Sequence, residues 1–265
     1  MGRRYSVRSG GGGLAGVSSQ LAAGDGSAVT VGSGLSLSGG TLTAPGYKTV
    51  HDYAWSADSG TTHTNGTQTT NGSIVWNWVI QAGTSAVSDA KGLKLSYVNG
   101  FYAGPLANLS QSALSSSALG GRWRWWARYQ NASGGSRSAT IIHAASATDA
   151  ANWFGVRVLN ASVFVDSGVS TSINSNGTAA WRTTYDVLMV EHDGASFTVR
   201  FGVWSGGWPS VGSMMPFYMW TPSATDLNTL SGAGLGLSTN WLAFWALGTG
   251  TSSTYLYNTR IDLAP

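Results

Sequence analysis

From Tyr47 onward, short apolar and β-branched runs recur between clusters of turn-forming residues, and none of them has a helical period. Many short strands at this spacing favour an antiparallel β-sandwich. The chain therefore predicts an all-β fold. The expected strands are KTVHDYAW, GSIVWNWVIQ, LKLSYV, RWRWWARYQN, SATIIHAAS, WFGVRVL, ASVFVDS, YDVLMVEH, SFTVRFGVW, PFYMWTP, NWLAFWALG and TYLYNTRIDL.

The best-supported pair of strands lies in YDVLMVEHDGASFTVRF. Asp193 and Gly194 form a dipeptide that favours a two-residue type I′ turn, because both central positions need a positive φ. Counting outward from that turn places Val190 opposite Phe197 and gathers the large apolar side chains on one face. A slip of one residue would give Val190 a polar partner, so turn and pattern agree on a hairpin.

A change in composition near Pro45 and Gly46 divides the chain. All 13 tryptophans follow it, whereas 13 of the 37 glycines lie in the 46 residues before it. Residues 1–28 cannot bury enough apolar surface to offset their ordering entropy, so we expect them to be flexible. We predict an extended, glycine-rich N-terminal arm over residues 1–46, for anchoring or oligomerisation, and a β-sandwich over residues 47–265.

Within the arm, VTVGSGLSLSGGTLTA (residues 29–44) alternates apolar and polar residues, as a half-buried strand does. A lone two-stranded ribbon is marginal in water, but three copies around a threefold axis would bury its apolar residues. GSGLSLSGGTLTA resembles segments of bacteriophage fibre and virion-appendage proteins, which implies a homotrimer. A strand on its own domain and a linker are the alternatives. The residues expected to oligomerise or anchor the chain are Val29, Val31, Leu35, Leu37, Leu42, Arg3, Arg4 and Arg8.

Charge is sparse and nearly balanced outside the arm. Only 9% of the residues are charged, and the 219 residues after the arm hold 11 basic and 10 acidic groups. Nucleic-acid binding needs clustered Lys and Arg, so we expect no nucleic-acid partner. The lack of cysteine excludes disulfides and thiolate metal sites. Because no long apolar run or signal peptide is present, we expect neither membrane insertion nor export.

Three segments in the second half carry a family resemblance. NWFGVRVLNASVFVDSG, WRTTYDVLMVEHDGASFTVRFGVWSGGWPSVGS and YLYNTRIDLAP resemble the laminin-G and concanavalin A-like jelly-roll domains over roughly residues 150–265. The resemblance implies an antiparallel jelly-roll β-sandwich, lectin-like, for the large domain. It supports the fold much more than a function.

Residues for catalysis or a metal are scarce. Glycoside hydrolysis needs two carboxyl groups that flank the bond, but the chain has one glutamate, Glu191, and lacks the Glu-x-Asp-x-x-Glu motif of the resembled hydrolases. The four histidines are isolated, and no G-x-S-x-G motif occurs. We therefore expect no enzyme, no catalytic residue and no cofactor. The resemblance allows calcium, for which residue type alone offers Asp149, Asp166, Asp193 and Asp226.

The aromatic residues are more informative. In RWRWWARY, Trp123, Trp125 and Tyr129 share one strand face, which we expect to be core. The other face sets arginines around Trp126, a surface suited to carboxylated or sulfated sugars, to cation–π pairing or to another subunit; alternatively, arginine stems simply cover the indole. Trp55, Trp76 and Trp78 are expected in the core.

Trp208, in SGGWPS, lies on a loop, where it can stack on a sugar or pack back onto the sandwich. The family resemblance favours packing. The candidate carbohydrate-binding residues are Trp208, Trp153, Asn152, Trp241, Trp126 and Arg124.

The leading hypothesis is a bacteriophage virion protein, a tail fibre, appendage or capsid-decorating head fibre, that displays a lectin-like domain for attachment to host-surface glycans. Its partners would be two further copies of the chain, other virion proteins bound through the arm, and a cell-surface glycan. Such a protein would be made in the host cytoplasm and reside in the virion. The alternatives are a bacterial carbohydrate-active enzyme or lectin with a jelly-roll fold, and a capsid cement protein without a ligand.

Overall fold

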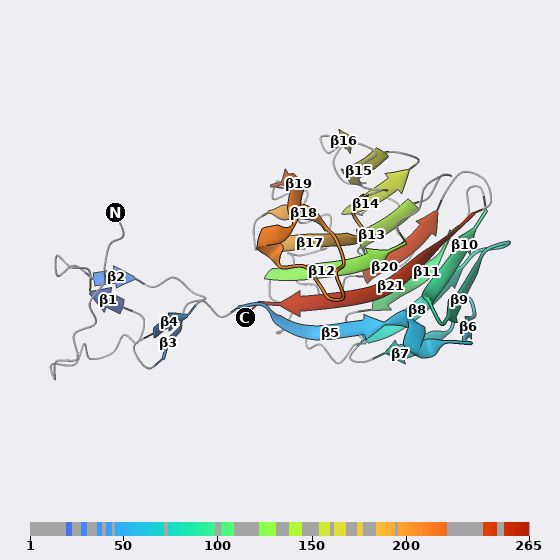
Figure 1. Cartoon of the computed structure of the whole chain (residues 1–265), viewed down its shortest axis with the longest axis horizontal. Helices are drawn as coiled ribbons and strands as arrows, with labels where there is room; N and C mark the ends of the chain where they lie inside the picture. The colour runs from blue at the N-terminus through green and yellow to red at the C-terminus, as the bar shows by residue number, and fades with distance from the viewer. Residues whose placement is uncertain are drawn as a thin grey trace. The chain divides into compact units, whose positions relative to one another are not determined.

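The structure, a computed structural model, divides the chain into two compact units, residues 1–47 and residues 48–264 (Figure 1). It describes residues 20–22, 28–30, 36–38, 41–43, 46–71, 74–98, 102–108, 122–130, 138–144, 154–159, 162–167, 174–176, 184–193, 196–221, 241–247 and 252–264. Each of the twelve predicted runs contains a strand, and every strand pair within these described ranges is antiparallel. The large unit is an antiparallel jelly-roll β-sandwich, as predicted.

The larger sheet of the sandwich has nine strands in the order β19-β18-β17-β12-β21-β10-β9-β6, with β5 paired to β21. β12 and β21 lie at its centre, so side chains on their outer face are surrounded by sheet on both sides. The strands are β5 (Lys48–Ala54), β6 (Thr62–His63), β9 (Ser85–Asp89), β10 (Gly92–Tyr97), β12 (Arg122–Tyr129), β17 (Val187–Asp193), β18 (Phe197–Gly202), β19 (Met215–Trp220) and β21 (Ser252–Leu263).

A second, five-stranded sheet has the order β13-β20-β11-β8-β7. Its strands are β7 (Gln68–Asn71), β8 (Ile74–Ile80), β11 (Tyr102–Asn108), β13 (Ser138–Ala144) and β20 (Trp241–Leu247). A third sheet of three strands joins β14 (Phe154–Leu159), β15 (Ser162–Ser167) and β16 (Asn174–Asn176). One turn of 3₁₀ helix, η1 (Trp55–Asp58), follows β5. In the described ranges, no helix is long and apolar enough to cross a membrane.

The core contains tryptophans from both large sheets. Trp76 of β8 packs against Trp125 of β12, with ring centroids 6.3 Å apart, and Trp55 contacts both Trp76 and Trp78. All are 0–1% exposed. The predicted core positions of these residues, and of Trp123 and Tyr129, are therefore confirmed. Each such ring buries roughly 150–250 Å² on folding, which makes the aromatic residues the main apolar contribution to this core.

The β17–β18 hairpin forms, but its predicted register is wrong by two residues. Val190 pairs with Val199, and Phe197 pairs with His192. Asp193 is the last residue of β17 rather than a central turn residue, and its carboxylate accepts the backbone N–H of Ser196 at 2.8 Å. The Asp side chain closes the turn from its first position. Because the shift is even, the same side chains still face the core.

The N-terminal unit contains two small antiparallel sheets. β1 (Gln20–Ala22) pairs with β2 (Ala28–Thr30), and β3 (Ser36–Ser38) pairs with β4 (Thr41–Thr43). Val29 lies opposite Leu21, and Leu37 lies opposite Leu42, so the predicted β segment comprises short hairpin strands. The other predicted oligomerisation and anchoring residues, Val31, Leu35, Arg3, Arg4 and Arg8, lie outside the described residues. The trimer stays a prediction.

Candidate functional site

The loop between β18 and β19, residues 203–214, folds back over the outer face of the larger sheet. In Figure 1 it lies in front of β12 and reaches β21. The loop ends in a short 3₁₀ turn, η2 (Val211–Ser213). Beneath it, Trp126 is 2% exposed and packs in a second apolar cluster with Val187, Met189 and Met214. The outer face of the sheet therefore has a small core of its own.

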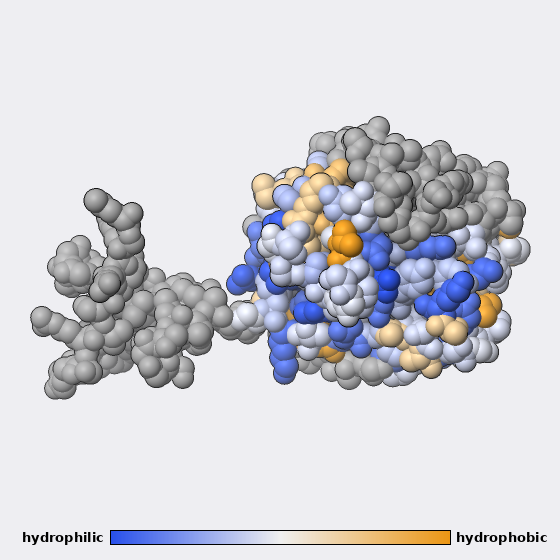
Figure 2. Space-filling view, viewed as in Figure 1, coloured by the Kyte–Doolittle hydropathy of each residue, from blue (hydrophilic) through white to orange (hydrophobic). Residues whose placement is uncertain are grey.

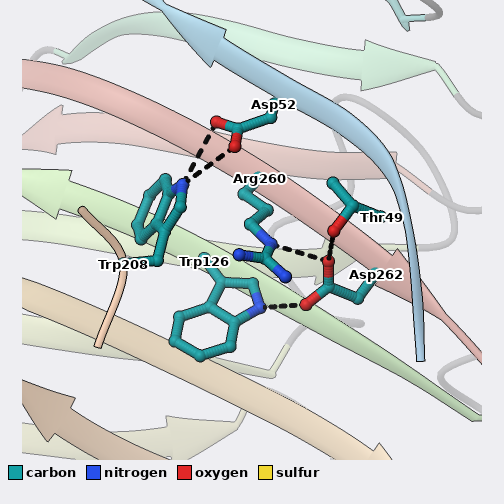
Figure 3. A network of polar contacts seen from close by, with 6 residues as sticks. All are labelled: Thr49, Asp52, Trp126, Trp208, Arg260 and Asp262. Carbon is teal, nitrogen blue, oxygen red and sulfur yellow. Dashed lines mark hydrogen bonds and ion pairs between the residues drawn. The ribbon is translucent and has the colours of Figure 1, made fainter. Parts of the chain in front are cut away.

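A buried carboxylate fixes the floor of this region (Figure 3). Asp262 of β21 is 1% exposed, and its Oδ2 accepts the indole N–H of Trp126 at 2.8 Å. Its Oδ1 accepts Thr49 Oγ1 at 2.8 Å and Arg260 Nε at 2.7 Å. The Arg260 guanidinium also lies 5.4 Å from the centroid of the Trp126 ring. Charge-assisted hydrogen bonds of this kind hold a side chain in one geometry, so Trp126 is a rigid support.

Trp208 lies above this floor and is tied down on two sides. Its indole N–H points at both oxygens of Asp52, at 3.1 and 3.2 Å. Its ring lies 5.8 Å from the ring of Trp126 and 5.1 Å from that of Trp204, which it meets at 81°. Trp208 thus packs back onto the sheet, as the family resemblance favours, while its side chain stays half-buried.

Arg128 of β12 extends the arrangement toward β21. Its guanidinium lies 4.7 Å from the centroid of the Trp204 ring and 4.8 Å from that of the Tyr257 ring. Tyr255 stacks on Tyr257 at 5.9 Å. We call the half-buried rings of Trp208, Trp204, Tyr257 and Tyr255 the aromatic strip. It is a row of rings on the outer face with Arg128 inserted between Trp204 and Tyr257.

The Tyr255 end of the strip is also held by a carboxylate. The Tyr255 hydroxyl donates to Asp89 Oδ2 at 2.7 Å. That hydrogen bond lowers the pKa of Asp89 and raises the pKa of Tyr255. Both groups therefore keep their donor and acceptor roles at neutral pH. Since Trp208 and Tyr255 are each anchored, the strip is preorganised over its length.

The sequence candidates fall in different places. Trp208 belongs to the strip, whereas Trp126 supports it from below and does not offer a free ring. Arg124 pairs with Glu191, the two Arg nitrogens Nε and Nη2 lying 2.9 and 2.8 Å from the same carboxylate oxygen. Trp241 is the first residue of β20. Its side chain, with Asn152 and Trp153, lies outside the described residues.

Sequence reasoning missed three strip residues, Trp204, Tyr255 and Tyr257. Tyr255 and Tyr257 stand two residues apart in a predicted strand, so they were recognisable as a pair of rings on one face. Trp204 closes the predicted strand run SFTVRFGVW. The sequence therefore predicts that Trp204 lies at the end of a strand. Nothing in the sequence indicates that it packs against Arg128, which is 76 positions away.

Of the four aspartate candidates for calcium, the structure describes the side chain of Asp193 alone. Among the described residues, no group of three His, Asp or Glu side chains could hold a metal ion. Asp193 uses its carboxylate in the β17–β18 turn. Asp149 and Asp226 lie outside the described residues, as does the side chain of Asp166.

No family model and no curated protein sequence matches the chain. Solved structures similar to it include the apo Crh5 transglycosylase, with 12% identity, a TM-score of 0.47 and coverage of 82% of this chain and 90% of that one. The metal-free VIP36 exoplasmic/lumenal domain has 9% identity, a TM-score of 0.47 and coverage of 82% and 92%. A lectin from Bauhinia forficata, in complex with GalNAc, has 8% identity, a TM-score of 0.43 and coverage of 80% and 97%.

Proposed function

We propose that the sandwich, residues 48–264, is a carbohydrate-binding domain that acts without catalysis, and that the aromatic strip is its contact surface. The observation that carries the proposal is that Trp208, Trp204, Tyr257 and Tyr255 are half-buried rings fixed by hydrogen bonds, ring contacts and a cation–π pair. An aromatic face complements the C–H face of a sugar ring. Fixed rings also lose little further conformational entropy when a ligand binds.

The polar groups around the strip match a hydroxylated ligand. Asp52 is exposed and offers acceptor oxygens, while Arg128 and Arg260 are partly exposed and offer donors. A few placed polar groups beside aromatic rings are the usual composition of a small-molecule site. On the face seen in Figure 2, the hydrophobic residues of the described surface gather mainly at the upper left of the large unit, and hydrophilic residues cover much of the rest. That surface favours a hydroxylated ligand over a large apolar partner.

The absence of catalysis belongs to the proposal because two carboxylates of this face, those of Glu191 and Asp262, are committed to structural contacts. Glu191, the chain's one glutamate, is ion-paired with Arg124 at 2.8 Å. Asp262 is 1% exposed and both of its oxygens accept hydrogen bonds. Glycoside hydrolysis needs two carboxyl groups free to act on the scissile bond.

We also propose that the domain is displayed on a bacteriophage particle, with residues 1–46 as the anchoring arm. Support comes from the division of the chain at residue 47 into two units and from the fibre-like composition of residues 29–44. In this setting the domain attaches the particle to surface glycans of its host.

A glycan array with the full chain tests the binding proposal. We expect binding to at least one glycan, and a loss of roughly two- to tenfold in Trp208→Ala, because stacking on one ring contributes on the order of 0.5–1.5 kcal/mol. Tyr218→Ala is the matched control, since Tyr218 is a half-buried ring on the edge strand β19, three strands from β12. Circular dichroism should show that both variants are folded. Binding that Trp208→Ala leaves intact would place the site elsewhere, and release of reducing ends from a bound polysaccharide would overturn the non-catalytic assignment.

A further inference from the structure

The arginine inside the aromatic strip is held in an unusually fixed position. Arg128 comes from the central strand β12, Trp204 from the loop after β18, and Tyr257 from β21. The guanidinium lies 4.7 Å from the centroid of the Trp204 ring and 4.8 Å from that of the Tyr257 ring, so it contacts both rings. Cation–π contact with two rings restricts a side chain that otherwise has many rotamers.

The hydrogen bonds of Arg128 fix one edge of the guanidinium and leave the other available. Its Nε donates to Asp186 Oδ2 at 3.1 Å, and Asp186 Oδ1 accepts the backbone N–H of Trp204 at 2.8 Å. One carboxylate thus ties the arginine and the loop together. Within the part of the chain that the structure describes, the two Nη groups of Arg128 have no hydrogen-bond partner, and the side chain is 27% exposed.

Arg124 and Arg260, two other arginines of this face, do not share that arrangement. Arg124 commits Nε and Nη2 to Glu191. Arg260 donates its Nε to Asp262 but lies directly across from the exposed carboxylate of Asp52 in the strand pairing. Asp52 would repel an anion beside Arg260. The carboxylate that contacts Arg128, Asp186, lies instead at the Nε edge of the guanidinium, away from the two Nη groups.

We propose that Arg128 is the recognition point for an anionic sugar, one that carries a carboxylate or a sulfate group, on the aromatic strip. The two Nη groups present paired donors that a planar carboxylate or a sulfate accepts in a bidentate fashion. The sugar ring that bears the anion then lies against Trp204 or Tyr257. The inference rests on the proposed carbohydrate binding and names the class of glycan. Because Asp186 offsets the charge of Arg128, recognition depends on this local donor geometry rather than on a positive surface field.

Matched acidic and neutral glycans test this directly. The probes are sialyllactose against lactose, oligogalacturonate against its methyl ester, and a sulfated galactan oligosaccharide against the desulfated one, titrated calorimetrically into the full chain. We expect one acidic member to bind roughly tenfold or more tightly than its neutral counterpart, since a hydrogen bond to a charged group contributes about 1.5–3 kcal/mol. The sialyllactose and oligogalacturonate pairs test recognition of a carboxylate, and the galactan pair tests recognition of a sulfate.

Variants identify the residue that gives the preference. Arg128→Gln should abolish the preference for the acidic member, and Arg128→Lys, which keeps the charge but loses the paired donors, should retain only a small part of it. Lys48→Gln removes the same charge from an exposed position on β5 and should leave the preference unchanged. Circular dichroism verifies that each variant is folded.

The two proposals fail in different ways. Neutral and acidic members that bind equally well, or a preference that survives in Arg128→Gln, would overturn the assignment of Arg128 and leave carbohydrate binding in place. If no member of any pair binds and no other glycan does, both proposals fail.

Discussion

At the residue scale, the structure assigns different tasks to side chains of one type. Trp76 and Trp78 are core residues, Trp126 is a buried support with its N–H on Asp262, and Trp208 lies half-buried above it. Two histidines, in contrast, have similar surroundings. His51 forms a hydrogen bond with Thr259. His63 forms a hydrogen bond with Ser88 and stacks on Trp78, with ring centroids 3.6 Å apart. Both are buried among aromatic rings.

These two histidines predict a loss of stability in mild acid. Burial lowers the pKa of each from 6.5 to about 4. Between those values the unfolded chain binds protons that the folded chain does not, so the free energy of unfolding falls as the pH falls from about 7 toward 4. Urea unfolding at pH 7, 6 and 5 measures this. His51→Phe, which keeps a ring beside Trp76, should give a shallower dependence. Equal stability of the wild-type chain at pH 7 and pH 5 would contradict the prediction.

The sequence predicts the strand face on which a site residue lies, but not the residue that it contacts. Arg128 and its neighbours in RWRWWARY could be placed on the correct strand face, because alternation in a strand follows from local geometry alone. The partners could not: Trp208 meets Asp52 across 156 positions and Trp126 meets Asp262 across 136. Such pairs are set by the order of the strands in the sheet.

At the element scale, the strands with a clear apolar pattern were predictable, whereas β9, β11 and the loop after β18 were not. In a run such as YDVLMVEH, the spacing of apolar residues itself predicts a strand. The segment SGGWPS predicts only a turn, and the packing of the folded chain decides where that loop lies. The error in the β17–β18 register has a similar origin. Asp193 can take a central turn position or close the turn with its side chain, and the structure adopts the second.

The close packing of the loop on the end of β18 predicts a sharp difference between two glycines. A Cβ at Gly202 would lie 2.7 Å from Pro209 Cγ and 3.3 Å from Met214, whereas at Gly207 it would meet nothing within 4 Å. We expect Gly202→Ala to lower the free energy of unfolding by about 1–3 kcal/mol and to displace Trp208, with a change in tryptophan fluorescence. Gly207→Ala should stay within about 0.5 kcal/mol of the wild type. Equal effects of the two substitutions in urea unfolding would show that the loop does not pack as described.

At the scale of the whole molecule, the chain joins a small unit with short hairpins to a large sandwich. β3 and β4 make a two-stranded sheet, and such a sheet is marginal in water without further packing. We propose that other copies of the chain supply that packing through β3 and β4. The two units meet between residues 47 and 48, next to the composition change at Pro45 and Gly46, which says nothing of what the arm contacts.

The native mass of the full chain, beside that of a chain beginning at Tyr47, tests the trimer. We expect light scattering to give about three times 27.5 kDa for the full chain and a monomer for the shorter one. Two monomers would contradict trimerisation through the arm. A trimer in both would place the contacts in the sandwich instead.

The central claim is that the aromatic strip contacts a glycan, and the indole N–H signals of the tryptophans report on it most directly. Nuclear magnetic resonance of the ¹⁵N-labelled chain, titrated with the best-binding glycan of the array, follows all 13 tryptophans at once. The account predicts that the signals of Trp204 and Trp208 shift progressively and saturate, while those of the core residues Trp76 and Trp78 stay in place. Binding that leaves Trp204 and Trp208 unshifted would contradict the claim.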